Sequence, residues 1–180
     1  MYVILPTRPK DRDDISLILD NVFGVNRKNK PSYALRNNFP AIDDLSFVAR
    51  CGERVVGTIS FWPISIGNKK KPALLLGPLG VAPEMQNYGI GGSLISKGHV
   101  MAKEKGYKLI LLVGELSYYS RFNYISASPF GLTMKDEDPA RLLVHELEFE
   151  ALNGISGQLQ PAEHFRPNMI KKVIMQQASY

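Results

Sequence analysis

Cysteine is almost absent from this 180-residue chain, in which Cys51 is the single thiol. One cysteine excludes an internal disulfide framework and a cysteine-based zinc cluster. The chain also lacks any apolar run near the roughly 18 residues that a membrane-spanning helix needs. Residues 2–5 are apolar, but the run stops at Pro6 and is too short for the core of a signal peptide. We therefore expect a cytoplasmic protein with no membrane partner.

The composition is that of a globular protein. Hydrophobic residues make up 44% of the chain and charged residues 22%, which is average for folded soluble proteins and unlike disordered ones. A chain of this length can bury roughly 70% of its unfolded surface without a covalent staple. We expect one domain over residues 1–180, with a core over 1–150 and a C-terminal tail over 151–180 packed on it. The apolar residues of this tail leave a homodimer contact open.

The net charge of +5 points to an anionic partner without naming it. Apart from the lysines at 69–71, the basic residues are scattered, and aromatic residues do not interleave with them. The sequence shows no recognition helix and no aromatic platform, so we expect no nucleic-acid partner. A basic nucleic-acid-binding protein stays a distant alternative, since a modest positive charge suits an anionic small ligand at least as well.

The first half of the chain predicts one main helix and an antiparallel meander. Residues 2–5 form a strand, and a helix capped by Asp13 or Asp14 follows. Its apolar residues fall at helical spacing: Ile15, Ile18, Leu19, Val22 and Phe23. A short helix is expected from Ser32. Tight turns at Gly52-Glu53 and at 67–69 then join three strand-like runs, over residues 45–51, 54–66 and 73–81.

The second half mixes helices and strands. Glycines at 89–92 open a helix that runs to about residue 105, where Gly106 supplies the C-terminal cap. Residues 108–113 are continuously apolar, which is typical of a strand buried on both faces. A short helix over 116–122 and strands near 124–134 and 142–150 follow. The order predicts an α/β (mixed α+β) fold, with a mixed sheet flanked by helices on both sides.

The segment 86–92 lies between a predicted strand and a predicted helix and contains three glycines. Glycines there allow a tight turn and expose backbone N–H groups at a helix start, which suits a phosphate or pyrophosphate. A Walker A loop is excluded because no lysine precedes Ser93. A dinucleotide-binding fingerprint is disfavoured because Leu94 stands where a third glycine is needed, and because a meander precedes the loop.

Gln86, Gly89 and Gly91 match the Gln/Arg-x-x-Gly-x-Gly/Ala loop of the GNAT superfamily of N-acetyltransferases, which the sequence resembles over about residues 2–135. The family also carries a tyrosine ahead of a Gly-aromatic pair, for which this chain has Tyr119 and the pair Asn123-Tyr124. Asparagine replaces glycine there, a mild departure because asparagine tolerates a left-handed backbone. The double tyrosine at 118–119 is similar to bacterial members described as predicted acetyltransferases.

The resemblance implies the GNAT fold, with a mostly antiparallel sheet splayed at the acetyl-CoA strand. It implies an acetyl-CoA-dependent N-acetyltransferase that transfers acetyl directly to a primary amine, from a small molecule or a protein, without a metal. Gly77-Pro78 predicts a bulge that opens a slot for the pantetheine arm. The cofactor-binding residues implied are Leu79, Val81, Gln86, Asn87, Tyr88, Gly89, Ile90, Gly91, Gly92, Ser93 and Tyr119.

By the same resemblance Tyr119 is the catalytic acid that meets the departing thiolate. Tyrosine titrates near 10 and a thiol near 8.5, so Tyr119 is expected to act mainly as a hydrogen-bond donor. Tyr118 lies about 100° away on a helix, so one of the two is expected to face the cofactor. The general base is open: residues 73–81 contain no carboxylate, and Glu115 is either a base or a solvated charge at a strand end.

The remaining candidate residues give weaker evidence of a functional role. Cys51 is expected to be a buried small hydrophobe or a strand-end residue. Trp62 is expected to pack in the core, with the acceptor side as the alternative. The three histidines, His99, His145 and His164, lack metal-ligand spacing, so no metal site is expected. By resemblance, residues 23–39 contribute to the acceptor pocket. A non-catalytic acyl-CoA-binding or regulatory module of the same fold remains the alternative, because the glutamate that many relatives place before the loop is missing.

Overall fold

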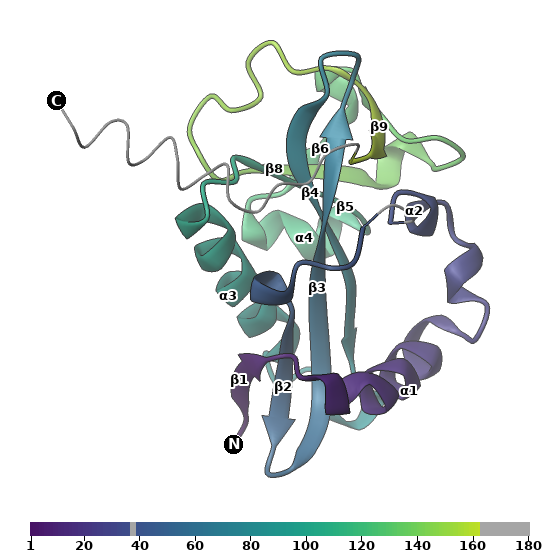
Figure 1. The fold of residues 1–180 in the computed structure, drawn as a ribbon, viewed down its shortest axis with the longest axis vertical. Helices are drawn as coiled ribbons and strands as arrows, with labels where there is room; N and C mark the ends of the chain where they lie inside the picture. The colour runs from purple at the N-terminus through teal and green to yellow at the C-terminus, as the bar shows by residue number, and fades with distance from the viewer. Residues whose placement is uncertain (37–38, 163–180) are drawn as a thin grey trace, which may run out of the picture.

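The computed structural model describes residues 1–36 and 39–162 of the chain. Its central sheet runs in the order β1-β2-β3-β4-β5-β8-β6 (Figure 1). These strands are β1 (Val3–Pro6), β2 (Phe47–Cys51), β3 (Arg54–Ile66), β4 (Lys71–Val81), β5 (Leu109–Val113), β8 (Leu142–Glu146) and β6 (Ile125–Ser126). Neighbours along this path pair antiparallel except β4 and β5, which are parallel. The predicted meander and the mixed, mostly antiparallel sheet are confirmed.

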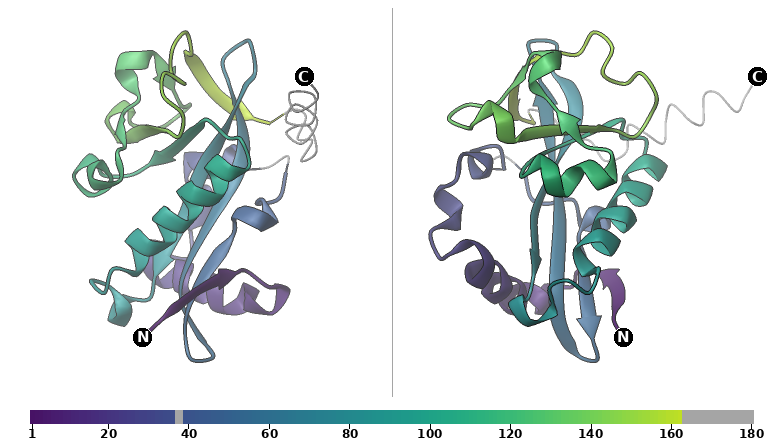
Figure 2. Two further views of the ribbon diagram at one scale, coloured as in Figure 1. Left: turned by 90° about the vertical axis from the view of Figure 1, so that its left-hand side faces the viewer. Right: turned by 180° about the vertical axis from the view of Figure 1, so that it is seen from behind.

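Helices α1 (Arg12–Phe23) and α3 (Ile90–Glu104) cover opposite faces of the sheet, as the left view of Figure 2 shows. Strand residues alternate between the two faces, so that Phe47 packs in the α3 core with Leu94, whereas Val48 packs against Ile18 of α1. The short helices α2 (Pro31–Ala34) and α4 (Leu116–Tyr119) lie at the residues predicted for them.

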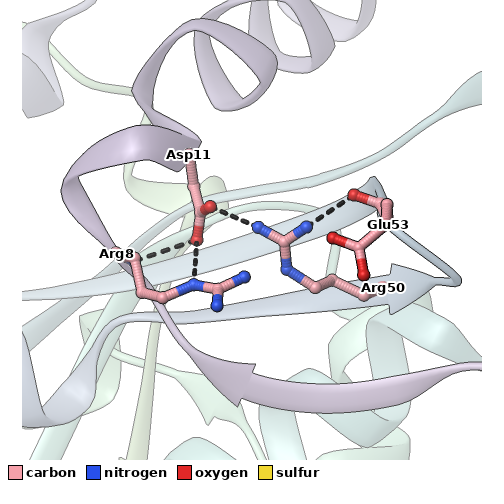
Figure 3. A network of polar contacts seen from close by, with 4 residues as sticks. All are labelled: Arg8, Asp11, Arg50 and Glu53. Atoms are coloured by element: carbon pink, nitrogen blue, oxygen red, sulfur yellow. Dashed lines mark hydrogen bonds and ion pairs between the residues drawn. The ribbon is translucent and has the colours of Figure 1, made fainter.

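The capping prediction for α1 is wrong. The helix begins at Arg12 after Asp11, and Asp13 and Asp14 lie in its first turn, where their charges favour the helix dipole. The Asp11 carboxylate is buried and accepts hydrogen bonds from the Arg8 backbone N–H, at 2.9 Å, and from the Arg50 guanidinium (Figure 3). Arg50 also donates to the Glu53 carbonyl, so this pair ties the start of α1 to the β2–β3 hairpin.

The predicted bulge at Gly77-Pro78 is present in β4. Ile59 pairs with Leu79 and Phe61 with Leu76, so β4 contains one more residue than β3 over this interval. On its other edge β4 pairs with β5 only at Leu74 and Leu75. Beyond Leu75 the two strands therefore separate, which is the splay that the sequence predicted.

The C-terminal third departs most from the prediction. Residues 124–134 form two short strands, β6 and β7 (Leu132–Thr133), because Pro129 and the left-handed Gly131 interrupt them with a 3-10 turn. The strand predicted over 142–150 ends at Glu146. Sequence reasoning missed β9 (Gly157–Pro161), which pairs with the end of β3 and with β7. The rest of the predicted tail, residues 163–180, lies outside the described residues.

Candidate active site

A cleft of about 840 Å³ opens where β4 and β5 separate. Its walls come from residues 76–79 of β4, from 112–115 at the end of β5, from the loop before α3, and from the 22–36 segment between α1 and α2. Segments far apart in sequence thus meet at one splayed edge of the sheet. Beyond Leu75 this edge of β4 pairs with no strand among the described residues, and Leu76, Gly77, Pro78, Leu79 and Val81 line the cleft there.

The glycine loop lies at the end of this cleft. Asn87 and Gly89 both adopt a left-handed backbone, with φ of +67° and +78°, and Gly89 is the residue at which α3 starts. The Gln86 side-chain amide donates to the Val81 carbonyl at 3.3 Å and so fastens the loop to β4. Gly91 lines the cleft at the first turn of α3, where the free N–H groups and the helix dipole favour an anion.

Nine of the eleven predicted cofactor residues line the cleft: Leu79, Val81, Gln86, Asn87, Gly89, Ile90, Gly91, Gly92 and Tyr119. Ile90 is 1% exposed and its side chain packs close to Gly57 in the core. Tyr88 and Ser93 are not among the lining residues. Tyr88 is 68% exposed, and the Ser93 hydroxyl lies 2.8 Å from the hydroxyl of Tyr2.

Tyr118 and Tyr119 both line the cleft, although we expected one of them to face the cofactor. Their rings meet edge to face with centroids 4.9 Å apart. The hydroxyl of Tyr118 approaches Gly91 in the loop, and the ring of Tyr119 packs against Gly114 at the end of β5. Burial, with a smaller contribution from Tyr118, raises the pKa of Tyr119 well above its ordinary value. Tyr119 is therefore neutral at physiological pH and able to donate a hydrogen bond.

Tyr119 packs against a group of aromatic side chains that residue spacing in the sequence does not predict. Tyr124 is 1% exposed and its ring meets that of Tyr119 edge to face. Its hydroxyl lies 2.9 Å from Nε2 of His99, and His99 stacks on His145 with centroids 4.4 Å apart. Asn123, which replaces the family's glycine, has a φ of +63°, as its conformational tolerance predicts. Two of the three histidines thus pack in the aromatic group that contacts Tyr119. His164 lies outside the described residues.

Carboxylates approach the cleft from β5 and from the loop after β7. The Glu115 side chain is 71% exposed and pairs with Arg141 at 3.2 Å, and Asp136 and Glu137 line the cleft beside it. Glu115 is therefore a solvated strand-end charge that also reaches the cleft. Within residues 1–36 and 39–162, no three His, Cys, Asp or Glu side chains are grouped to hold a metal ion. No helix in the same residues could span a membrane.

Arginines are the cleft residues that sequence reasoning missed. Arg27 and Arg36 come from the segment after α1, and Arg121 lies with its guanidinium 4.1 Å from the Tyr118 ring centroid. Phe23, Lys30 and other members of the 22–36 segment line the cleft, and a role of residues 23–39 in the acceptor pocket stays a prediction. Cys51 is exposed at the end of β2, one of its two predicted settings. Trp62, predicted in the core, is partly buried against it.

Residues 4–127, more than half of the chain, match the sequence model of the acetyltransferase (GNAT) domain. The chain belongs to the GNAT acetyltransferase family. Among curated GNAT relatives, the uncharacterized N-acetyltransferase YhbS of Escherichia coli K12 is 27% identical over 159 residues, covering 87% of this chain and 94% of YhbS. The uncharacterized N-acetyltransferase YjhQ of the same strain is 30% identical over 66% of each chain.

Solved GNAT structures share the fold described above. Escherichia coli YhbS in complex with CoA superposes with a TM-score of 0.78 at 26% identity, covering 91% of each chain. A GNAT acetyltransferase from Brucella melitensis in complex with acetyl-CoA gives a TM-score of 0.63 at 29% identity, covering 82% of this chain and 89% of that one. The family and the fold inferred from the glycine loop are thereby confirmed, and this GNAT protein is a transferase.

Proposed function

We propose that this GNAT acetyltransferase transfers the acetyl group of acetyl-CoA directly to a primary amine. One observation carries the proposal: the splayed edge of β4 and the glycine loop at the start of α3 open into the same cleft. The similar GNAT structures that hold CoA or acetyl-CoA support it. Acetyl-CoA supplies an activated thioester, and the chain's own residues must hold it, polarise it and manage two protons.

The loop would hold the phosphates. Backbone N–H groups at Gly91 and Gly92 face the cleft at the positive end of the α3 dipole, and Arg121 adds a cation beside Tyr118. The contact between Gly91 and the Tyr118 hydroxyl leaves no room for a Cβ there without a shift. A side chain at this position would therefore displace the Tyr118 hydroxyl.

The edge of β4 would hold the pantetheine arm. On the side away from β3, residues 76–81 pair with no other strand among the described residues, so backbone groups around Leu79 and Val81 would be available to the arm's amides. The Val81 carbonyl is the exception, because it already accepts from the Gln86 side chain. One such N–H would donate to the thioester carbonyl, where negative charge grows during attack. Tyr119 would donate its hydroxyl proton in a hydrogen bond to the departing sulfur. Its raised pKa keeps that proton in place until charge develops.

The amine must lose a proton as it attacks. β4 carries no carboxylate, and Glu115 is the glutamate that lines the cleft at the end of β5. We propose that the proton leaves to solvent through Glu115 or directly to water, because the Glu115 side chain is 71% exposed. The absence of a carboxylate on β4 is also the observation that favours the rival function, an acyl-CoA-binding module without turnover.

Release of CoA from acetyl-CoA in the presence of a panel of primary amines separates these functions. If the protein is an acetyltransferase, CoA release should depend on the added amine. Tyr119→Phe should then lower kcat by about 10²-fold while acetyl-CoA still binds. Binding without amine-dependent release in the wild-type protein would support the regulatory module. Absence of acetyl-CoA binding would contradict both.

A further inference from the structure

Arg36 enters the cleft from the residues just after α2, and its guanidinium lies between two aromatic rings. Its Cζ is 4.1 Å from the ring centroid of Tyr33 and 5.4 Å from that of Trp62. The Nε and Nη1 atoms are buried and have no hydrogen-bond partner among the described residues. The indole Nε1 of Trp62 is likewise buried without a partner there. Two neighbouring side chains therefore present three unsatisfied N–H donors, and buried donors are normally paired.

Arg27 in the same segment, in contrast, has a hydrogen-bond partner for each of its three guanidinium nitrogens. Its Nε donates to Asp20 at 2.7 Å, and its other nitrogens donate to Tyr33 and Ser16 at 2.8 and 3.2 Å. Arg36 forms no ion pair among residues 1–36 and 39–162. Two neighbouring groups act on its charge: the Tyr33 hydroxyl, which favours it, and the like charge of Arg27, which opposes it. Burial lowers the pKa of Arg36 to about 10, which still leaves it protonated at neutral pH. The described part of the chain thus holds a cation in this wall of the cleft without supplying its counter-ion.

The position of Arg36 separates it from the phosphate loop. Its Nη2 lies 3.4 Å from the point that a Cβ on Gly77 would occupy, beside the bulge where β4 leaves β5. Gly77 precedes Val81 by four strand residues, which is about 13 Å of β4 before the loop begins. Arg36 therefore stands at the end of the cleft where the acceptor, rather than the phosphates, would bind.

The chemistry of the donors indicates which group they bind. Nε and Nη1 each share an edge of the guanidinium with Nη2, and such an edge matches the two oxygens of a carboxylate. Trp62 adds a further donor and no acceptor. Glu115, Asp136 and Glu137 line the same cleft, and Arg141 pairs with Glu115 at 3.2 Å and with Glu137 at 3.8 Å. The three carboxylates outnumber this arginine, so this part of the cleft still suits an ammonium group. A molecule that carries both a carboxylate and an amine would find a complementary charge for each.

We propose that the acceptor of this acetyltransferase is a primary amine that also bears a carboxylate, and that Arg36 binds the carboxylate. The inference rests on the proposed function. The ammonium form of the acceptor gives one proton to solvent and attacks as the amine. The new N–C bond forms as the C–S bond breaks, and the second amine proton is balanced by protonation of the sulfur to CoA thiol.

Matched acceptors test the proposal on the wild-type protein. Glycine, β-alanine and 5-aminopentanoate are each compared with their carboxamides, which keep the amine and lose the charge. CoA release should show at least one acid preferred by tenfold or more in kcat/KM. A calorimetric titration of the CoA-bound protein with the same pairs measures acid-selective binding without requiring turnover.

Variants assign the preference to Arg36. Arg36→Gln should raise the KM of the preferred acid tenfold or more and remove the preference, with the KM of acetyl-CoA unchanged. Arg36→Lys keeps the positive charge but lacks the paired N–H groups of a guanidinium edge, so it should retain only part of the preference for the acid. Lys28→Gln removes the same charge from an exposed side chain of the same segment that does not line the cleft, and should keep the preference.

The outcomes distinguish failure of the inference from failure of the function. Turnover of amides as good as that of acids, or an unchanged preference in Arg36→Gln, would overturn the inference and leave the acetyltransferase intact. Acid-selective binding without CoA release would support the Arg36 site and overturn the function. A further experiment compares succinyl-CoA with acetyl-CoA as the acyl donor. If the protein prefers succinyl-CoA and Arg36→Gln loses this preference, Arg36 binds a carboxylate on the acyl group, and the acceptor assignment is overturned.

Discussion

The hydroxyl oxygen of Tyr118 lies 2.8 Å from the point that a Cβ on Gly91 would occupy, whereas the ring of its neighbour Tyr119 packs against Gly114. Adjacent tyrosines on one short helix thus reach two parts of the site. Tyr118 contacts the loop proposed to hold the phosphates, and Tyr119 lies at the end of β5 in front of Tyr124. The two side chains are therefore expected to affect different kinetic constants.

Gly114→Ala should act on kcat. A methyl group at Gly114 would overlap the Tyr119 ring and displace its hydroxyl, so we expect kcat to fall by about 10-fold or more, since misplaced catalytic groups lose rate steeply. Tyr118→Phe should instead weaken acetyl-CoA binding a few-fold with kcat nearly unchanged. Steady-state kinetics with acetyl-CoA varied checks both. A kcat loss in Tyr118→Phe that matches that of Tyr119→Phe would reverse the assignment.

Acid should destabilise the protein through His99. Burial, with a smaller contribution from His145, lowers the pKa of His99 from 6.5 to about 4. Between these values the unfolded chain binds more protons than the folded one, so stability is full above about pH 6.5 and falls as the pH drops toward 4. The loss from this residue amounts to at most about 3 kcal/mol.

His99→Gln removes this titration and should flatten the dependence of unfolding free energy on pH between about 6.5 and 4. Urea denaturation at several pH values measures it. A slope as steep in the variant as in the wild type would show that His99 is not the residue responsible.

Loss of the Asp11 carboxylate should cost far more than loss of a surface partner. Asp11→Ala leaves the Arg50 guanidinium buried and without its counter-charge, which typically costs about 3–5 kcal/mol. Glu148→Ala breaks the exposed pair with Lys108 and should cost about 0–1 kcal/mol. Thermal or urea unfolding compares the two variants. Equal costs would contradict the role of the Asp11–Arg50 pair in fixing the start of α1.

Local pattern was sufficient to predict the elements that build the cofactor side of the cleft. Helical spacing gave α1, turn glycines gave the β2–β3–β4 meander, and Gly77-Pro78 gave the bulge. These features are encoded within a few residues of where they act. β9 could not be found this way, because residues 157–161 have little strand character and pair with residues of β3 that lie 93 to 97 positions earlier and with residues of β7 that lie 25 positions earlier.

The residues missed in the site share one property: their environment is assembled by tertiary contacts. Nothing near Arg36 in sequence predicts that Trp62 will stack on it, and His99 and His145 lie 46 positions apart before the fold stacks their rings. Conversely, the prediction that Asp13 or Asp14 caps α1 considered only local spacing. Asp11 is instead the residue that precedes the helix, and its carboxylate accepts a hydrogen bond from Arg50.

Thermal unfolding of the purified protein with and without acetyl-CoA tests the central claim most directly. At about 100 times the dissociation constant, binding adds roughly 2.7 kcal/mol and should raise Tm by about 5–10 °C for a domain of this size. Gly91→Glu places a carboxylate in the first turn of α3 without the left-handed strain that Gly89 carries, and should abolish the shift; Ser96→Glu, exposed on the same helix, should retain it. A rise in wild type and Ser96→Glu alone supports cofactor binding at the glycine loop. No rise in the wild-type protein at millimolar acetyl-CoA, or an equal rise in Gly91→Glu, would contradict it.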